Sequence, residues 1–182
     1  MKTGRDTMKI LIALDAGPQS AEIVREVASR AWPAKSRFLL LNVLDPYPYT
    51  KMPMSLASAK AGISAKLSAN AERLIKSGWK AETAVVVGRA RQDISKMASS
   101  WKADLVLVGS SEEGPLMRAL LGSTARSVLR HAPCSVGIVR PVGREKKGKH
   151  QGVIVWVANH GADCSLAALR AGAKSHCPIA TP

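Results

Sequence analysis

Short, continuously apolar runs recur along the chain, and most of them are followed by stretches in which apolar residues return at spacings of three and four. Continuous apolar runs are typical of strands buried on both faces, whereas the wider spacing is typical of helices that cover a sheet on one side. The expected strands are residues 9–14, 37–43, 81–87, 105–108 and 135–139, and the expected helices are residues 20–32, 56–76, 91–101 and 123–131.

This alternation of strands and helices predicts an α/β fold with a five-stranded parallel sheet and helices on both faces, of the Rossmann-like, doubly wound kind. Ligands of such folds bind at the carboxyl ends of the strands, near the point where the strand order reverses. Asp15, Val43, Gly88 and Gly109 stand at the carboxyl ends of four expected strands. This edge of the sheet is therefore where we expect a site.

The chain has 182 residues and is 46% hydrophobic, which suits one domain with a core and a tail. We expect an N-terminal extension over residues 1–8, one domain over 9–140, and a basic linker and tail over 141–182. The pattern of the tail weakly resembles that of the first residues of the chain: an apolar run and a polar turn come before a helical pattern. Three interpretations stay open: a truncated second repeat, a strand added to the sheet edge or packed on a partner, and a loosely attached segment.

The net charge is +14, from 27 Lys and Arg against 13 Asp and Glu. A solvated basic face is favoured over nucleic-acid binding, because no nucleic-acid motif or interleaved aromatic pattern accompanies the charge. No apolar run approaches the length of a membrane span, and the first residues lack a signal-peptide pattern, so we expect a cytoplasmic protein. The three cysteines have no CxxC spacing, and Cys134 is interpreted as a small buried hydrophobe.

Several familiar α/β sites are absent from the sequence, including GxGxxG, GxxxxGK[ST] and GxSxG. Over about residues 8–140 the chain instead resembles the universal stress protein family, which implies the five-stranded fold described above, a homodimer formed through the fifth strand, and a protein partner. The stretches that carry the resemblance are ILIALD at 10–15, LLLNVLDP at 39–46, VVVGRARQDISKMA at 85–98, ADLVLVGS at 103–110 and LLGSTARSVLRHAPCSVGIVR at 120–140.

The resemblance also implies an adenine-nucleotide site, with ATP and Mg²⁺ as the expected ligand, because many members bind ATP through a loop of pattern G-x2-G-x9-G-[ST]. On this chain the loop positions fall on Gly109, Glu112, Gly122 and Ser123, with the spacing kept. No nucleophile is paired with a base, so weak ATP hydrolysis is the most that we expect. The implied nucleotide-binding residues are Ala13, Leu14, Asp15, Val43, Val108, Gly109, Glu112, Gly122, Ser123 and Thr124, and no metal ligands are implied.

Glu112 stands where the nucleotide-binding members have glycine. A phosphate loop aims backbone N–H groups at an anion, and a carboxylate roughly 4–6 Å from a phosphate charge costs about 3–4 kcal/mol at an effective dielectric near 20. Gly114, two positions later, would supply the flexible backbone that Glu112 does not, and Arg118, Arg126 or a nucleotide-bound Mg²⁺ would offset part of the repulsion. Two functions therefore stay open: a stress-response protein that binds adenine nucleotide, and a dimeric interaction module in which Glu112 disables the loop.

Some of these residues also have interpretations that need no ligand. Gly122 is a suitable helix entry, and Ser123 or Thr124 is a suitable N-cap. Asp15 is a suitable turn former ahead of Gly17. Each of these residues therefore has two interpretations, a structural one and one as a ligand contact.

Overall fold

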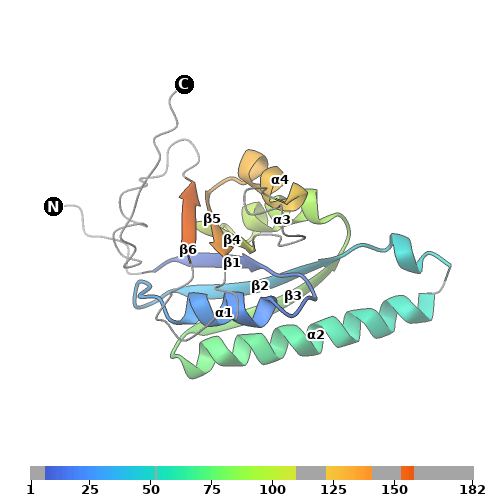
Figure 1. The fold of residues 1–182 in the computed structure, drawn as a ribbon, viewed down its shortest axis with the longest axis horizontal. Coiled ribbons are helices and arrows are strands. Elements are labelled where there is room, and N and C mark those ends of the chain that lie inside the picture. The colour runs from blue at the N-terminus through green and yellow to red at the C-terminus, as the bar shows by residue number, and fades with distance from the viewer. Residues whose placement is uncertain (1–6, 52, 110–121, 141–152, 158–182) are drawn as a thin grey trace, which may run out of the picture.

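A single sheet of mostly parallel strands forms the centre of the computed structural model (Figure 1), which describes residues 7–51, 53–109, 122–140 and 153–157. Across these residues the strand order is β3-β2-β1-β4-β5-β6. The first five strands pair in parallel, and β6 pairs with β5 in the antiparallel direction. The strands are β1 (Lys9–Ala13), β2 (Arg37–Leu44), β3 (Lys80–Val87), β4 (Leu105–Gly109), β5 (Ser135–Arg140) and β6 (Val153–Val157).

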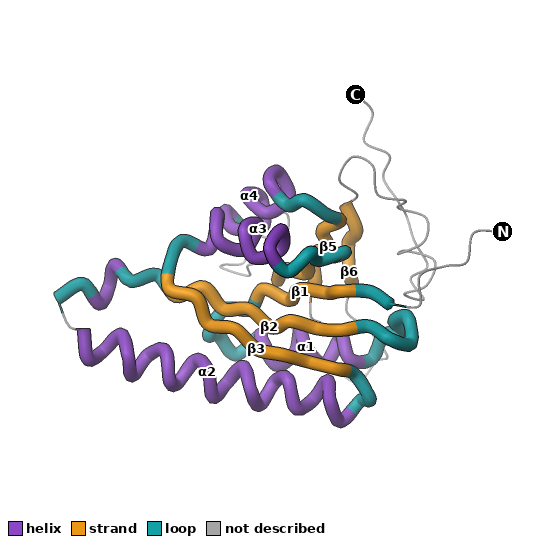
Figure 2. The backbone as a smooth tube through the Cα atoms, turned by 180° about the vertical axis from the view of Figure 1, so that it is seen from behind, coloured by secondary structure: helices purple, strands orange, loops and turns teal. Residues whose placement is uncertain are grey.

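Helices cover both faces of the sheet, with α1 and α2 on one face and α3 and α4 on the other (Figure 2). A short 3₁₀ helix, Tyr47–Tyr49, follows β2. Within the described ranges no helix combines the length and the apolar character that crossing a membrane requires. The helices are α1 (Ser20–Ala28), α2 (Pro53–Lys76), α3 (Ala90–Ser100) and α4 (Ser123–His131).

Successive residues of each inner strand enter opposite halves of the core, because side chains alternate across a sheet. Ile10 and Ile12 of β1 pack with α1 and α2, whereas Leu11 between them packs with α3 and α4. All three side chains are fully buried. The continuous apolar runs in the sequence are thus explained by a sheet that has no solvent-facing side at its centre.

The expected α/β fold with a five-stranded parallel sheet is confirmed, and the element boundaries differ only in detail. The expected helix at residues 20–32 ends earlier, at Ala28. Pro33 disfavours a helical backbone at Trp32, whose indole N–H donates a 2.8 Å hydrogen bond to the Val27 carbonyl instead. Trp32 lies edge-on to Phe38, with ring centroids 5.9 Å apart.

The tail contributes a strand to the sheet edge. Of the interpretations left open by the sequence, β6 corresponds to the added strand. Residues 141–152 and 158–182 lie outside the described residues, as do residues 1–6, so the proposed domain boundaries and the truncated-repeat interpretation stay predictions.

Cys134 lies just before β5 and packs, partly buried, against the core on the α3 and α4 side. Burial raises the pKa of its thiol to about 11, and the nearby Asp104 carboxylate adds to the shift. This environment suits a packing role, since the reactive form of a cysteine is the thiolate.

The side chain of Asp93 accepts hydrogen bonds at the amino end of α3, beside the sheet edge where a site is expected. Its Oδ2 accepts a 2.7 Å hydrogen bond from the backbone N–H of Arg89, and its Oδ1 accepts one of 3.1 Å from Lys96 Nζ. The Arg89 hydrogen bond and then Lys96 lower the pKa of the Asp93 carboxyl. Gly88 makes room for this contact, because a Cβ there would lie 2.1 Å from Asp93 Oδ2.

We predict a pH-dependent loss of stability in Asp93→Ala. Because the folded state lowers the pKa of Asp93 from 3.8, the stabilisation is present above that pH and is lost as the pH falls through the folded-state pKa. The Tm of the variant should fall below that of the parent at pH 7, and the difference should shrink below pH 3.8. Glu72→Ala, at an exposed position of α2, is the control, and its Tm difference should stay constant. An Asp93→Ala difference that is equal at pH 7 and pH 3 would contradict this account.

Candidate functional site

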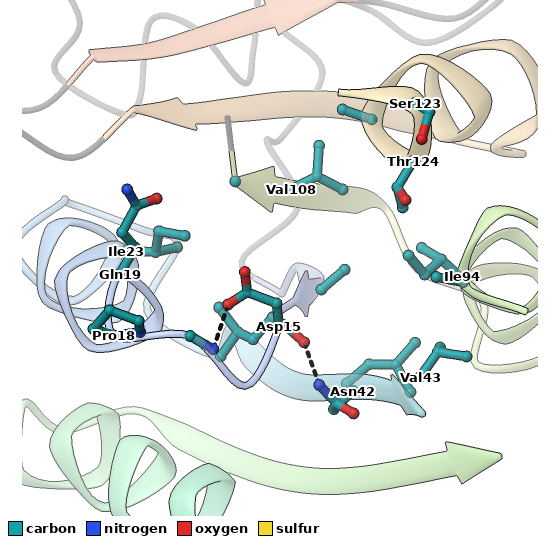
Figure 3. A pocket seen from close by; sticks show the side chains of 17 residues that line it. Asp15, Pro18, Gln19, Ile23, Asn42, Val43, Ile94, Val108, Ser123 and Thr124 are labelled. Carbon is teal, nitrogen blue, oxygen red and sulfur yellow. Dashed lines mark hydrogen bonds between the residues drawn. The ribbon is translucent and has the colours of Figure 1, made fainter. Parts of the chain in front are cut away.

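A cavity of about 400 Å³ opens at the carboxyl ends of β1, β2 and β4 (Figure 3). Its volume lies within the range of known ligand pockets. The chain leaves β1 and continues to β2 and β3 on one side, whereas β4 and β5 lie on the other side. The cavity therefore occupies the position where doubly wound sheets bind their ligands.

The register of the strands brings most of the expected site residues to this cavity. Ala13, the last residue of β1, is level with Leu41 of β2 and with Val108 of β4, and both neighbouring strands continue past this level, to Leu44 and Gly109. Gly122 adjoins the lining without being part of it, and Glu112 lies outside the described residues. The expected residues that line the cavity are Ala13, Leu14, Asp15, Val43, Val108, Gly109, Ser123 and Thr124.

Asp15 forms a turn and faces the cavity at the same time. Its Oδ1 accepts hydrogen bonds of 2.9 Å from the backbone N–H of Gly17 and from Ser20 Oγ. Its Oδ2 has no hydrogen-bond partner among the described residues, and Asp15 is exposed. The turn-forming interpretation and the ligand interpretation are thus compatible, because one oxygen is held by the turn and the other is available (Figure 3).

Asn42 is a site residue that the sequence interpretation missed. Its Nδ2 donates a 2.8 Å hydrogen bond to the Leu14 carbonyl, while the Leu14 N–H donates one of 2.9 Å to the Leu41 carbonyl. These bonds tie the end of β1 to β2 beside Asp15. Asn42 is buried, and its Oδ1 has no partner among the described residues. The signal was present in the sequence, because a lone amide interrupts the apolar run RFLLLNVL.

The amino end of α4 opens onto the cavity. Gly122 is the N-cap residue, and no side chain of the described residues hydrogen-bonds the end of the helix. Ser123, Thr124 and Ala125 line the cavity. The helix-entry interpretation of Gly122 holds, whereas the N-cap interpretation of Ser123 and Thr124 is wrong. The first N–H groups of a helix lack partners within it, so this end can bind an anion.

Apolar side chains complete the cavity walls, and sequence patterns did not identify them. Ile23 comes from α1, Ile94 from α3, and Leu41 from β2. In the sequence these residues have the spacing of ordinary core positions, so nothing local marks them as site residues. No group of His, Cys, Asp or Glu within the described ranges is arranged to hold a metal ion.

Gly109 lines the cavity, and close packing requires a glycine at this position. A Cβ at Gly109 would lie 2.7 Å from Ile23 Cδ1, which is too close for a normal contact. The glycine therefore lets α1 lie against the end of β4. Packing alone accounts for this glycine, whether or not a ligand approaches it.

Comparisons with known proteins identify a family that covers most of the chain. A model described as the universal stress protein family matches residues 7–140. A universal stress protein from Thermus aquaticus is 28% identical over 133 residues, which covers 72% of this chain and 97% of that protein.

Solved structures share the fold at lower identity. A universal stress protein from Archaeoglobus fulgidus, solved in complex with dAMP, matches with a TM-score of 0.51 and 22% identity, covering 72% of this chain and 96% of that one. A universal stress protein family protein from Arabidopsis thaliana, solved with AMP bound, matches with a TM-score of 0.52 and 19% identity, covering 78% and 97%.

We predict opposite stability changes for two glycine-to-alanine variants. Gly109→Ala forces Ile23 to move, and because Cδ1 is the end of a flexible side chain we expect a loss of about 1 kcal/mol. Gly62→Ala adds a methyl group in α2 where nothing lies within 4 Å, and it should gain about 0.5–1 kcal/mol. Urea unfolding measures both free energies. A Gly109→Ala variant as stable as Gly62→Ala would show that the contact with Ile23 does not constrain this position.

Proposed function

The chain belongs to the universal stress protein family, and on this premise we propose that its cavity binds an adenine nucleotide in a stress-response binding protein without efficient catalysis. The proposal is supported by the position of the cavity and by the nucleotides bound to two proteins of the same fold. We propose ATP with Mg²⁺ as the ligand and the cytoplasm as the location of the protein.

The observation that carries the proposal is the amino end of α4 at the cavity, which no side chain of the described residues caps. The helix dipole favours an anion at this end, and the first N–H groups of a helix have no partner within it. Ser123 and Thr124 add two hydroxyl groups that can donate to phosphate oxygens. We assign the phosphate side of the ligand to this end of the cavity.

The opposite end of the cavity suits a nucleoside. The available Oδ2 of Asp15 can accept a hydrogen bond from a ribose hydroxyl, and Ser20 and Gly17 hold the carboxylate in place for this role. Val43 and Ile94 are among the apolar lining residues that can cover a base. We assign the adenosine side to the ends of β1 and β2.

We expect the charge of Glu112 to lower the affinity of the cavity for phosphate groups. Its repulsion grows with the phosphate charge of the ligand and vanishes for adenosine, which carries no phosphate. If the carboxylate lies near the phosphates, it lowers the affinity for ATP most, lowers the affinity for AMP less, and leaves the affinity for adenosine unchanged. If the repulsion is strong enough to abolish nucleotide binding, the alternative function applies, an interaction module that binds no nucleotide.

We predict that Glu112→Gln strengthens ATP binding by up to roughly several hundredfold, strengthens AMP binding less, and leaves adenosine binding unchanged. Isothermal titration with ATP and Mg²⁺, AMP and adenosine measures the three affinities. Glu113→Gln is the matched control, because it removes the same charge one residue away from the glycine position of the loop.

Two results of this titration would count against the proposal. Binding of no adenine compound at millimolar concentration, by the parent or by Glu112→Gln, would contradict nucleotide binding. Binding by Glu112→Gln alone would instead establish the interaction module, with Glu112 as the block.

A further inference from the structure

Both edges of β5 are paired in this structure. One edge pairs in parallel with β4 from Ser135 to Val139, and the other pairs in the antiparallel direction with β6. The β6 pairing joins residues 136–140 to residues 153–157 over five consecutive positions. A strand from the C-terminal tail thus covers the edge at which the five-stranded parallel sheet would otherwise end.

Without β6, β5 would be an open edge that nothing in its own sequence protects. Val136, Ile138 and Val139 are buried apolar residues, and Arg140 at the end of the strand is its only charged residue. Open edges of this kind present unpaired N–H and C=O groups and pair readily with another chain unless charges, proline or a bulge prevent it. The β5 edge is therefore competent for self-association whenever β6 leaves it.

A second copy of the chain would compete with β6 for the same backbone groups. Two copies of β5 related by a two-fold axis perpendicular to the sheet must run antiparallel, because the axis reverses the strand direction. β6 already pairs with β5 in this direction. The two partners cannot occupy the edge together.

We propose that β6 is an intrachain cap that blocks self-association through β5, and that the chain dimerises through this edge only when β6 is displaced. The homodimer expected from the family resemblance is then the uncapped form. Because β6 belongs to the same chain, its effective concentration at β5 is on the order of millimolar for a short connection. At micromolar protein concentration the cap should exclude a second copy.

Proline substitution in β6 of the full chain tests the proposal. The N–H groups of neighbouring strand residues point to opposite edges, so the double variant Ile154→Pro/Val155→Pro removes one donor that faces β5 whichever residue supplies it. The matched control Ile154→Thr/Val155→Thr keeps both N–H groups and β-branched side chains. Light scattering after size exclusion, over a concentration series, measures the mass of each protein.

The expected result is a monomeric parent, a monomeric threonine control and a proline variant of twice the mass. Three results would overturn the proposal: a parent and a proline variant of the same mass at every concentration, a dimeric parent that the proline variant converts to monomer, and a threonine control that dimerises like the proline variant. The second of these would identify β6 itself as the interface.

Hydrogen exchange of the parent tests the cap without relying on any variant. The amides of residues 136–140 should be protected at concentrations where the parent is monomeric, because those facing β4 and those facing β6 are both paired. Exchange of half of them within seconds, in a protein whose other strands stay protected, would show that β6 is not paired and would overturn the proposal.

Discussion

The parallel pairing of β1 with both β2 and β4 is the constraint on which the rest of the structure depends. It places Ala13, Leu41 and Val108 at one height, so β1 ends between two longer neighbours, and residues of all three strands line the cavity there. The chain passes from β1 to β2 on one side of the sheet centre and from β4 to β5 on the other. For this reason α1 and α4 begin on different sides of the cavity. The order of the strands therefore fixes the location of the site, independently of any single side chain.

Local hydrogen bonds then refine what the strand order places there. Ser20 and Gly17 hold one oxygen of Asp15, and Asn42 ties the end of β1 to β2. Across the cavity, no side chain in the described ranges caps the start of α4, whose first N–H groups have no partner within the helix. A negative side chain on one side and a positive helix end on the other suit a ligand that has hydroxyl groups at one end and an anion at the other.

The sequence predicts the strands and helices well because the signal for each is local. Apolar runs and helical spacing reveal β1 to β5 without knowledge of the rest of the chain. The role of Asn42 and the pairing of β6 depend on contacts between distant segments, Asn42 with Leu14 and Val153 with Arg140. Patterns along the chain do not encode such contacts. The location of the site and its strand-end residues could therefore be predicted from the sequence, whereas its hydrogen bonds could not.

The central claim is that an adenine nucleotide binds between the end of β1 and the amino end of α4. The most direct test is to follow backbone amide resonances of the isotope-labelled full chain by NMR during titration with AMP and with adenosine. The account predicts that both ligands shift the amides around Asp15 and Val43, and that AMP alone shifts those of Ser123, Thr124 and Ala125 strongly. Shifts confined to other surfaces, or equal shifts at α4 with adenosine and AMP, would contradict it.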